Sequence, residues 1–193
     1  MLAKGEVQLW LASLQQLEPL EFHLALLSPA ELRRAAQISC AHRYRQFVGA
    51  RAVLRQILAG YFQVSPADLV IELSGNGKPY SAYCQFNLAH SGDRLLYGFS
   101  LEQAIGVDLE WMRPRDIAKF ERRLGYVPSS LGEFYQAWTR LEAIAKLTGG
   151  GVFQESPRDY AVVNFLPESN YMAAIAHAQP VTSFRFRQWP DHQ

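Results

Sequence analysis

Apolar side chains recur at helical spacing in two long segments of the chain. In the first, from about Arg43 to Phe62, the apolar positions are Phe47, Ala50, Leu54, Ile57 and Leu58. In the second, EFYQAWTRLEAIAKLT (residues 133–148), they are Phe134, Trp138, Leu141 and Ala145. Steps of three and four residues place such side chains on one face of a helix. Both segments are therefore predicted to be helices that pack through this face.

Capping signals mark the expected helix ends. The segment Ser28-Pro29-Ala30-Glu31 has serine at the N-cap, proline at the first helical position and glutamate at the third, which is the pattern of a capping box. Ser130 and Glu133 repeat this spacing at the start of the second long helix, and Ser65-Pro66-Ala67-Asp68 predicts a short helical turn. Glycines at 149–151 predict a firm helix end.

Between and after the helices, short apolar runs bounded by turn residues predict strands. These runs are LVIEL (69–73), CQFNLAHS (84–91), LLYGFSL (95–101), AIGVDLE (104–110), YAVVNFL (160–166), YMAAIAHA (171–178) and TSFRFRQW (182–189). The segment SGNGKP (74–79) has the residues of a turn. Helices followed by strands, twice in succession, favour an α+β fold. We expect two lobes, 1–102 and 103–193, that form one functional unit.

Composition narrows the functional classes. The chain has 193 residues, 49% of them hydrophobic, and a formal net charge of +1, so any anion-binding site is local and nucleic acid is not an expected partner. No apolar run reaches the roughly 20 residues of a membrane helix, and the N-terminus lacks the apolar core of a signal peptide. Cys40 and Cys84 fit neither a disulfide framework nor a zinc site. We expect a cytoplasmic monomer without a membrane partner.

Two carboxylates share one face of the predicted strand at 104–110. Side chains alternate along a strand, so Asp108 and Glu110 point to the side opposite Val107. Like charges so close together need a compensating cation, and Mg²⁺ commonly uses one or two carboxylates together with substrate phosphates. For this pair alone, the solvated outer face of an edge strand is the simpler interpretation.

Glu142 and Lys146 lie one turn apart on the second long helix, beside its apolar stripe. An ordinary surface ion pair would explain them equally simply. Near a tryptophan and a glycine-rich helix end, however, the glutamate would complete a metal site and the lysine would meet a phosphate.

Further candidate anion ligands lie earlier in the chain. Arg51 and Arg55 are helical neighbours of like charge, which indicates either a bound anion or a solvated face. Lys78 follows a glycine-containing turn whose amides suit an anion, although a solvated turn lysine is the simpler interpretation. His90 and Ser91 make a poor nucleophilic pair because neighbours on a strand point apart; His90 is better suited to donate to a phosphate, and a structural histidine is the alternative.

Taken in order, the segments RYRQFVGARAVLR, GKPY, FNLAHSGD, IGVDLE and WTRLEAIAKLTGGG resemble motifs of the 4′-phosphopantetheinyl transferases of the surfactin-synthetase-activating type. The resemblance spans roughly residues 43–151 and is nearest to short bacterial members that act on acyl carrier proteins. It implies two similar α/β lobes related by pseudo-twofold symmetry, with coenzyme A between them. The implied reaction moves phosphopantetheine from coenzyme A to a serine of an apo acyl or peptidyl carrier protein, in fatty acid, polyketide or peptide synthesis, and releases 3′,5′-ADP.

The resemblance also implies roles for individual residues. The metal ligands, for Mg²⁺ or alternatively Mn²⁺, would be Asp108, Glu110 and Glu142, with Glu142 and Lys146 as the catalytic residues. The residues implied to bind coenzyme A are Arg45, Arg51, Lys78, Pro79, His90 and Ser91.

The chain departs from the family pattern in two places. Leu141 stands where many members carry a lysine before the helix glutamate, and the segment between Glu110 and Phe134 is short. Three alternatives therefore stay open beside the transferase. They are a non-catalytic module that binds coenzyme A or a nucleotide, a different Mg²⁺-dependent phosphotransferase or pyrophosphohydrolase, and a structural protein.

Overall fold

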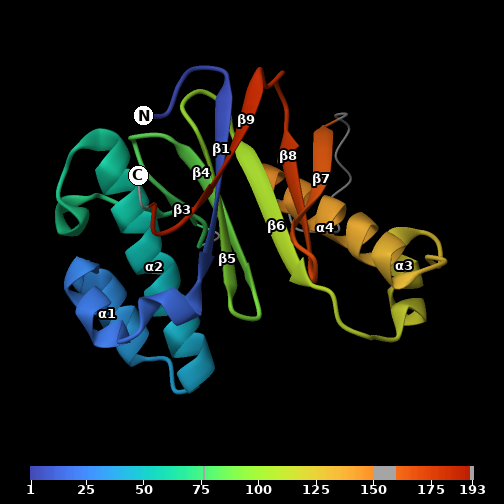
Figure 1. Cartoon of the computed structure of the whole chain (residues 1–193), viewed down its shortest axis with the longest axis horizontal. Coiled ribbons are helices and arrows are strands. Elements are labelled where there is room, and N and C mark those ends of the chain that lie inside the picture. Colours follow the sequence, from blue (N-terminus) through green and yellow to red (C-terminus); the bar gives the residue numbers. More distant parts are fainter. Residues whose placement is uncertain (76, 150–159, 192–193) are drawn as a thin grey trace.

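The computed structural model describes residues 1–75, 77–149 and 160–191. Two antiparallel-rich sheets lie face to face, and each is covered on its outer face by one long helix (Figure 1). The layers are thus helix, sheet, sheet and helix. This mixture of helices and largely antiparallel sheets agrees with the predicted α+β class.

The first sheet has the strand order β4-β5-β1-β9. Its strands are β4 (Gln85–Ser91), β5 (Arg94–Ser100), β1 (Glu6–Ser13) and β9 (Ser183–Gln188). Strand β1 pairs antiparallel with β5 and parallel with β9, which returns from the far end of the chain. Strand β1 was not among the strands predicted from the sequence. Both of its faces are buried, because Val7 and Leu9 pack between the sheets while Trp10 packs under the helix layer.

The second sheet has the order β6-β8-β7, with β6 (Ile105–Trp111), β8 (Tyr171–His177) and β7 (Ala161–Glu168) all antiparallel. A small hairpin joins β2 (Glu72–Leu73) to β3 (Pro79–Tyr80). The strand predicted at 69–73 is therefore much shorter than expected. The carbonyls of Pro66 and Leu69 accept hydrogen bonds from Arg55, which holds the start of this segment away from a sheet ladder.

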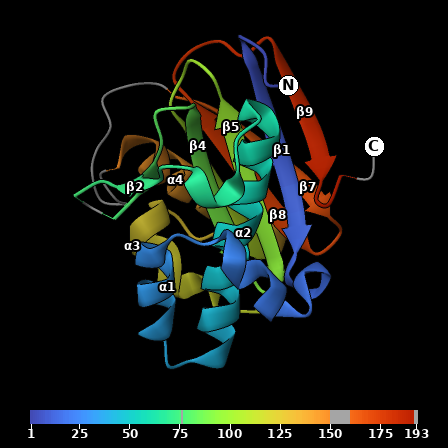
Figure 2. The ribbon, with the colours of Figure 1, turned by 90° about the vertical axis from the view of Figure 1, so that its left-hand side faces the viewer.

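The predicted helices are confirmed with small shifts at their ends. They are α1 (Pro29–Ala36), α2 (Ala41–Phe62) and α4 (Leu131–Thr148), and Figure 2 shows α1 and α2 in front of the first sheet. Short helices fill the connections: η1 (Leu14–Leu17), η2 (Leu20–Leu26), η3 (Pro66–Asp68), η4 (Ile117–Phe120) and α3 (Glu121–Leu124).

The helix caps follow the sequence signals in part, since Ser65 precedes η3 without a side-chain cap. At Ser28 the full capping box forms, with both reciprocal hydrogen bonds to Glu31. Ser130 accepts the backbone N–H of Glu133, whereas the glutamate side chain turns to Ser129 instead. Helix α4 ends at Gly149, whose φ of 73° lies in the left-handed region that favours glycine. Positions 150 and 151 of the predicted glycine stop lie outside the described residues.

Apolar side chains fill all three interfaces between layers. Between the sheets, Leu9 and Leu96 meet Val107 and Ile175, all at most 1% exposed. Gly98 allows this close approach, because a Cβ atom there would lie 2.8 Å from Cγ1 of Val107. The core therefore fixes β4 and β5 against β6, and these strands carry much of the candidate site.

Strand β9 belongs to the second half of the chain but completes the first sheet. The division into lobes at 1–102 and 103–193 stays a prediction. Cys40 is exposed and Cys84 is buried, and both are free thiols, as expected. None of the described helices is both long and apolar enough to cross a membrane.

Candidate active site

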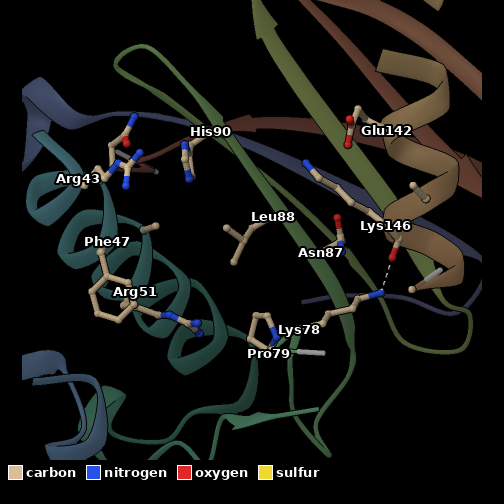
Figure 3. A pocket seen from close by; sticks show the side chains of 15 residues that line it. Arg43, Phe47, Arg51, Lys78, Pro79, Asn87, Leu88, His90, Glu142 and Lys146 are labelled. Carbon is tan, nitrogen blue, oxygen red and sulfur yellow. Dashed lines mark hydrogen bonds between the residues drawn. The ribbon is translucent and has the colours of Figure 1, made fainter. Parts of the chain in front are cut away.

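A cavity of about 640 Å³ lies between the N-terminal half of α2, strand β4 and the C-terminal half of α4 (Figure 3). Helix α2 supplies Arg43, Gln46, Phe47, Ala50 and Arg51 to its wall. The hairpin and β4 supply Gly77, Lys78, Pro79, Asn87, Leu88 and His90, and α4 supplies Glu142, Ala145, Lys146 and Gly149. Six residues predicted from separate motifs thus meet at one cavity: Arg51, Lys78, Pro79, His90, Glu142 and Lys146.

Cationic side chains outnumber acidic ones in the described wall of this cavity. Arg43, Arg51, Lys78 and Lys146 line it together with the single carboxylate of Glu142. The whole chain carries a formal charge of only +1, so this cationic character is local. A concave, partly apolar cavity with convergent cations suits a phosphorylated ligand.

The two neighbouring arginines of α2 have different environments. Arg55 is 1% exposed and donates to Glu31 and to the carbonyls of Pro66 and Leu69. Arg51 lies 3.8 Å from the same Glu31 carboxylate and lines the cavity. The interpretation of Arg55 as part of an anion site or of a solvated face is therefore wrong, since Arg55 is buried and pairs with Glu31 and two backbone carbonyls.

Arg45 does not line the cavity in the described part of the chain. It is half exposed and pairs with Glu18. Arg43 lines the cavity in place of Arg45. Positions 43, 47 and 51 lie on one face of the helix, whereas position 45 is rotated by about 200° from position 43. Helical spacing from Arg51 was the signal that would have selected Arg43.

Lys78 joins the hairpin to α4. Its Nζ donates to the backbone carbonyl of Lys146 at 2.7 Å, and burial lowers its pKa (Figure 3). The solvated turn lysine is thus excluded. Because the carbonyls in the last turn of a helix lack intrahelical donors, a lysine there is also favoured by the helix dipole.

Asp108 is buried, with 5% of the residue exposed. Its Oδ1 accepts a hydrogen bond from Lys146 Nζ at 2.7 Å, while Oδ2 has no hydrogen-bond partner among the described residues. Burial raises the pKa of Asp108 to about 6; the Lys146 charge opposes this, and the charges of Glu110 and Glu142 add to it. A solvated position is therefore excluded for Asp108, although β6 is an edge strand of its sheet, and Lys146 of α4 pairs with Asp108 of β6.

Helix α4 can lie this close to β6 because of Gly106. A Cβ atom at that position would stand 2.0 Å from the backbone oxygen of Ala143 and 2.5 Å from the backbone nitrogen of Leu147. The space beside Gly106 is therefore occupied by helix backbone. This contact brings Lys146 within reach of Asp108.

Glu110 is held by two other elements. Its Oε1 accepts from Trp138 Nε1 of α4 at 3.2 Å, and its Oε2 accepts from Ser91 Oγ of β4 at 3.3 Å. Helical spacing placed Trp138 in the core and did not indicate this hydrogen bond. The available signal was that the N–H of a buried indole usually has a hydrogen-bond acceptor, and that the strand predicted at 104–110 carries two carboxylates.

His90 and Ser91 point to opposite faces of β4, as expected for neighbours on a strand. His90 lines the cavity, and its pKa is lowered mainly by burial and further by the charges of Lys146 and His42. Ser91 faces β6 instead, where the backbone N–H of Trp111 donates to its Oγ at 2.9 Å.

The acidic residues suit a hard divalent cation in their donor chemistry. In the described ranges, no three acidic, histidine or cysteine side chains stand close enough together to form a metal-binding group. Asp108 nevertheless keeps one buried oxygen without a donor, and the charges of Glu110 and Glu142 are near enough to raise its pKa. An oxygen-only set with one orphaned carboxylate atom fits Mg²⁺ or Mn²⁺.

Comparison with known proteins gives several relatives of one kind. The 4′-phosphopantetheinyl transferase HetI of Nostoc sp. is 30% identical over 213 aligned residues, which cover 92% of this chain and 90% of the relative. The enzyme psf-1 of Bacillus pumilus is 30% identical over 71% of this chain and 68% of its own length. AcpT of Escherichia coli K12 is 35% identical over 58% of this chain and 62% of its own. No protein-family model matches the chain.

Proposed function

This chain belongs to the 4′-phosphopantetheinyl transferases, and from that premise we propose that it modifies an apo acyl or peptidyl carrier protein. The transferred group is the 4′-phosphopantetheine of coenzyme A, and 3′,5′-ADP is the second product. The observation that carries this proposal is the cationic cavity beside the buried Asp108–Lys146 pair.

Coenzyme A occupies the cavity in this proposal. Arg43, Arg51 and Lys78 supply cations on the α2 and hairpin side, and His90 supplies a ring nitrogen from β4. Pro79 adds an apolar surface next to Lys78. The protein acts as a monomer in this proposal. Arg45 and Ser91 have no direct contact with coenzyme A in this proposal.

The carrier serine attacks the β-phosphorus of coenzyme A. The new serine–phosphorus bond forms as the bridging phosphoanhydride bond breaks, and the electron pair leaves with 3′,5′-ADP. Glu142, directly or through water, takes the serine proton. Lys146 and His90 stabilise the negative charge that grows on the leaving side, and positioning supplies much of the remaining rate enhancement.

Asp108, Glu110 and Glu142 would hold the Mg²⁺ ion, with Mn²⁺ as an alternative. When bound, the ion neutralises charge on the pyrophosphate oxygens. The protein's own contribution is to keep Asp108 ionised through Lys146, because burial alone would favour the protonated acid.

We also propose that the two halves of the fold are related by a pseudo-twofold axis. Each half contains a strand, a long helix and an antiparallel hairpin: β1, α2, β4 and β5 in the first, and β6, α4, β7 and β8 in the second. The strand orders correspond, since β4-β5-β1 matches β7-β8-β6. Strand β9 has no counterpart in this scheme.

A labelling assay tests the function. Purified protein, coenzyme A and Mg²⁺ are incubated with a panel of apo acyl and peptidyl carrier proteins, and the mass of each carrier is measured. We expect a gain of one phosphopantetheine on serine and release of 3′,5′-ADP. Binding of coenzyme A without labelling of any carrier would instead support a non-catalytic module, which Leu141 favours by removing a lysine next to Glu142.

A further inference from the structure

We propose that Ser91 and Trp138 are positioning residues, which orient the carboxylate of Glu110 beside Asp108. The inference rests on the proposed function, because it concerns the acidic face of β6. Glu110 is half-buried, and each of its two oxygens accepts a hydrogen bond from a different element. Its side chain is thereby fixed from β4 on one side and from α4 on the other.

The hydroxyl proton of Ser91 has a defined direction. A serine hydroxyl has one proton to donate. The backbone N–H of Trp111 already donates to Ser91 Oγ at 2.9 Å, so the hydroxyl acts as acceptor there and its own proton is directed to Glu110 Oε2. Ser91 therefore ties both the backbone of β6 and the Glu110 side chain to β4.

The indole of Trp138 is equally constrained. Its ring is 7% exposed, stacks on Phe134 at a centroid distance of 6.1 Å and meets the edge of Phe120 at 5.2 Å. An indole nitrogen is only a donor. Packing thus fixes the direction of the one N–H, which points to Glu110 Oε1.

Both donors are neutral and use only part of the capacity of the carboxylate. An ionised carboxylate has about four acceptor positions, so Glu110 keeps acceptor positions for a cation while its orientation is set. Asp108, two residues away on the same face of β6, holds the orphaned oxygen Oδ2. Partners that orient a metal ligand in this way typically change metal affinity by roughly 10–100-fold when they are removed.

Mn²⁺ binding, followed by the electron paramagnetic resonance signal of the free ion at fixed coenzyme A, tests the inference. The variants are Ser91→Ala and Trp138→Phe, which remove one donor each while keeping most of the packing. Matched controls are Ser81→Ala and Trp10→Phe, because these lose comparable donors, to Val70 and to Tyr61, on other parts of the molecule. Ser91→Thr keeps the hydroxyl.

We expect both site variants to bind Mn²⁺ roughly 10-fold or more weakly, the controls to bind as the wild type does, and Ser91→Thr to restore affinity. Unchanged affinity in a folded Ser91→Ala protein, or equal losses in the controls, would overturn the inference. So would a wild-type protein without saturable Mn²⁺ binding.

Carrier labelling by the wild type distinguishes a failure of the proposed function from a failure of the positioning roles. A wild-type protein that shows the expected series of Mn²⁺ affinities but labels no carrier contradicts the proposed function and leaves the positioning roles standing. A wild type that labels its carrier while Ser91→Ala and Trp138→Phe bind Mn²⁺ normally contradicts the positioning roles alone.

Discussion

Asp108 of β6 and Lys146 of α4 form an ion pair of 2.7 Å, in which the aspartate side chain is 7% exposed and the lysine side chain 31%. The pair joins a strand to a helix across an interface that Gly106 makes narrow. It also decides which charge state the buried acid adopts, because burial and the neighbouring glutamates favour protonation.

Replacing Lys146 with methionine removes this compensation. Asp108 Oδ1 then loses its donor while Oδ2 already lacks one. We expect the free energy of unfolding to fall by about 1–3 kcal/mol, as for other buried groups left without a partner, and transferase activity to be lost. Urea denaturation of Lys146→Met, Asp108→Asn and the double variant measures the coupling, and strictly additive losses would argue against a direct interaction.

Glu142→Gln tests the proposed proton acceptor. The amide keeps the size of the side chain but cannot take the serine proton, so we expect activity to fall by about 10²–10⁴-fold, the range of general-base contributions. The melting temperature should stay close to that of the wild type because Glu142 is only half-buried. Glu102→Gln, in an exposed pair with Lys4, is the control. A fully active Glu142→Gln protein would remove this residue from the mechanism.

Gly106→Ala should be severely destabilising. Its Cβ would lie 2.0 Å from the carbonyl oxygen of Ala143, which belongs to helix backbone and cannot rotate away. We expect a loss of about 1–3 kcal/mol or more, typical of overpacking, with reduced activity as α4 shifts. Gly60→Ala in α2 meets nothing within 4 Å and should be neutral or stabilising. Equal thermal stability of the two variants would refute the close contact.

The two arginines Arg55 and Arg45 should differ sharply in their effect on stability. Arg55→Met leaves Glu31 and two carbonyls without their buried donor, so we expect a loss of about 3–5 kcal/mol. Arg45→Met removes only an exposed pair with Glu18 and should change stability by less than about 1 kcal/mol. Chemical denaturation of both proteins makes the comparison; a loss for Arg55→Met as small as that expected for Arg45→Met would show that Arg55 is not structural.

His90 should make stability depend on pH. Its pKa in the folded protein lies below the ordinary value of 6.5, because burial and the charges of Lys146 and His42 oppose protonation. As the pH falls below 6.5, the unfolded chain binds the proton first, so the contribution of His90 is present at higher pH and is lost as the pH falls. The free energy of unfolding measured from about pH 7.5 to about pH 5.5 should decline less steeply in His90→Gln. Identical slopes in both proteins would contradict this assignment.

Local patterns in the sequence predicted the parts of the site that depend on a single element. The alternation of β6 placed Asp108 and Glu110 on one face, and helical spacing placed Glu142 next to Lys146. Contacts between elements were harder to predict. The close approach at Gly106, the pairing of Lys146 with Asp108 and the donation from Trp138 to Glu110 all depend on how α4 lies on the second sheet, which no local pattern specifies.

The N-terminal strand shows the same limit in the fold. Its residues alternate, but one face of the strand is covered by α2 and the other by the second sheet, so nearly all of β1 is buried and its pattern lacks a clearly polar face. The parallel partner β9 is distant in the sequence, and pairing over such a distance leaves no signal within a short window.

The pairing of β1 with β9 has a consequence for synthesis on the ribosome. Strand β1 is translated long before β9, so one of its hydrogen-bonding edges stays uncovered until β9 has been made. During that interval the nascent chain exposes a row of unpaired amides and carbonyls, the kind of edge on which chains aggregate. In the finished sheet β9 is the edge strand, and the exposed side chain of Arg185, which pairs with Glu6, places a charge there that discourages further strands from adding.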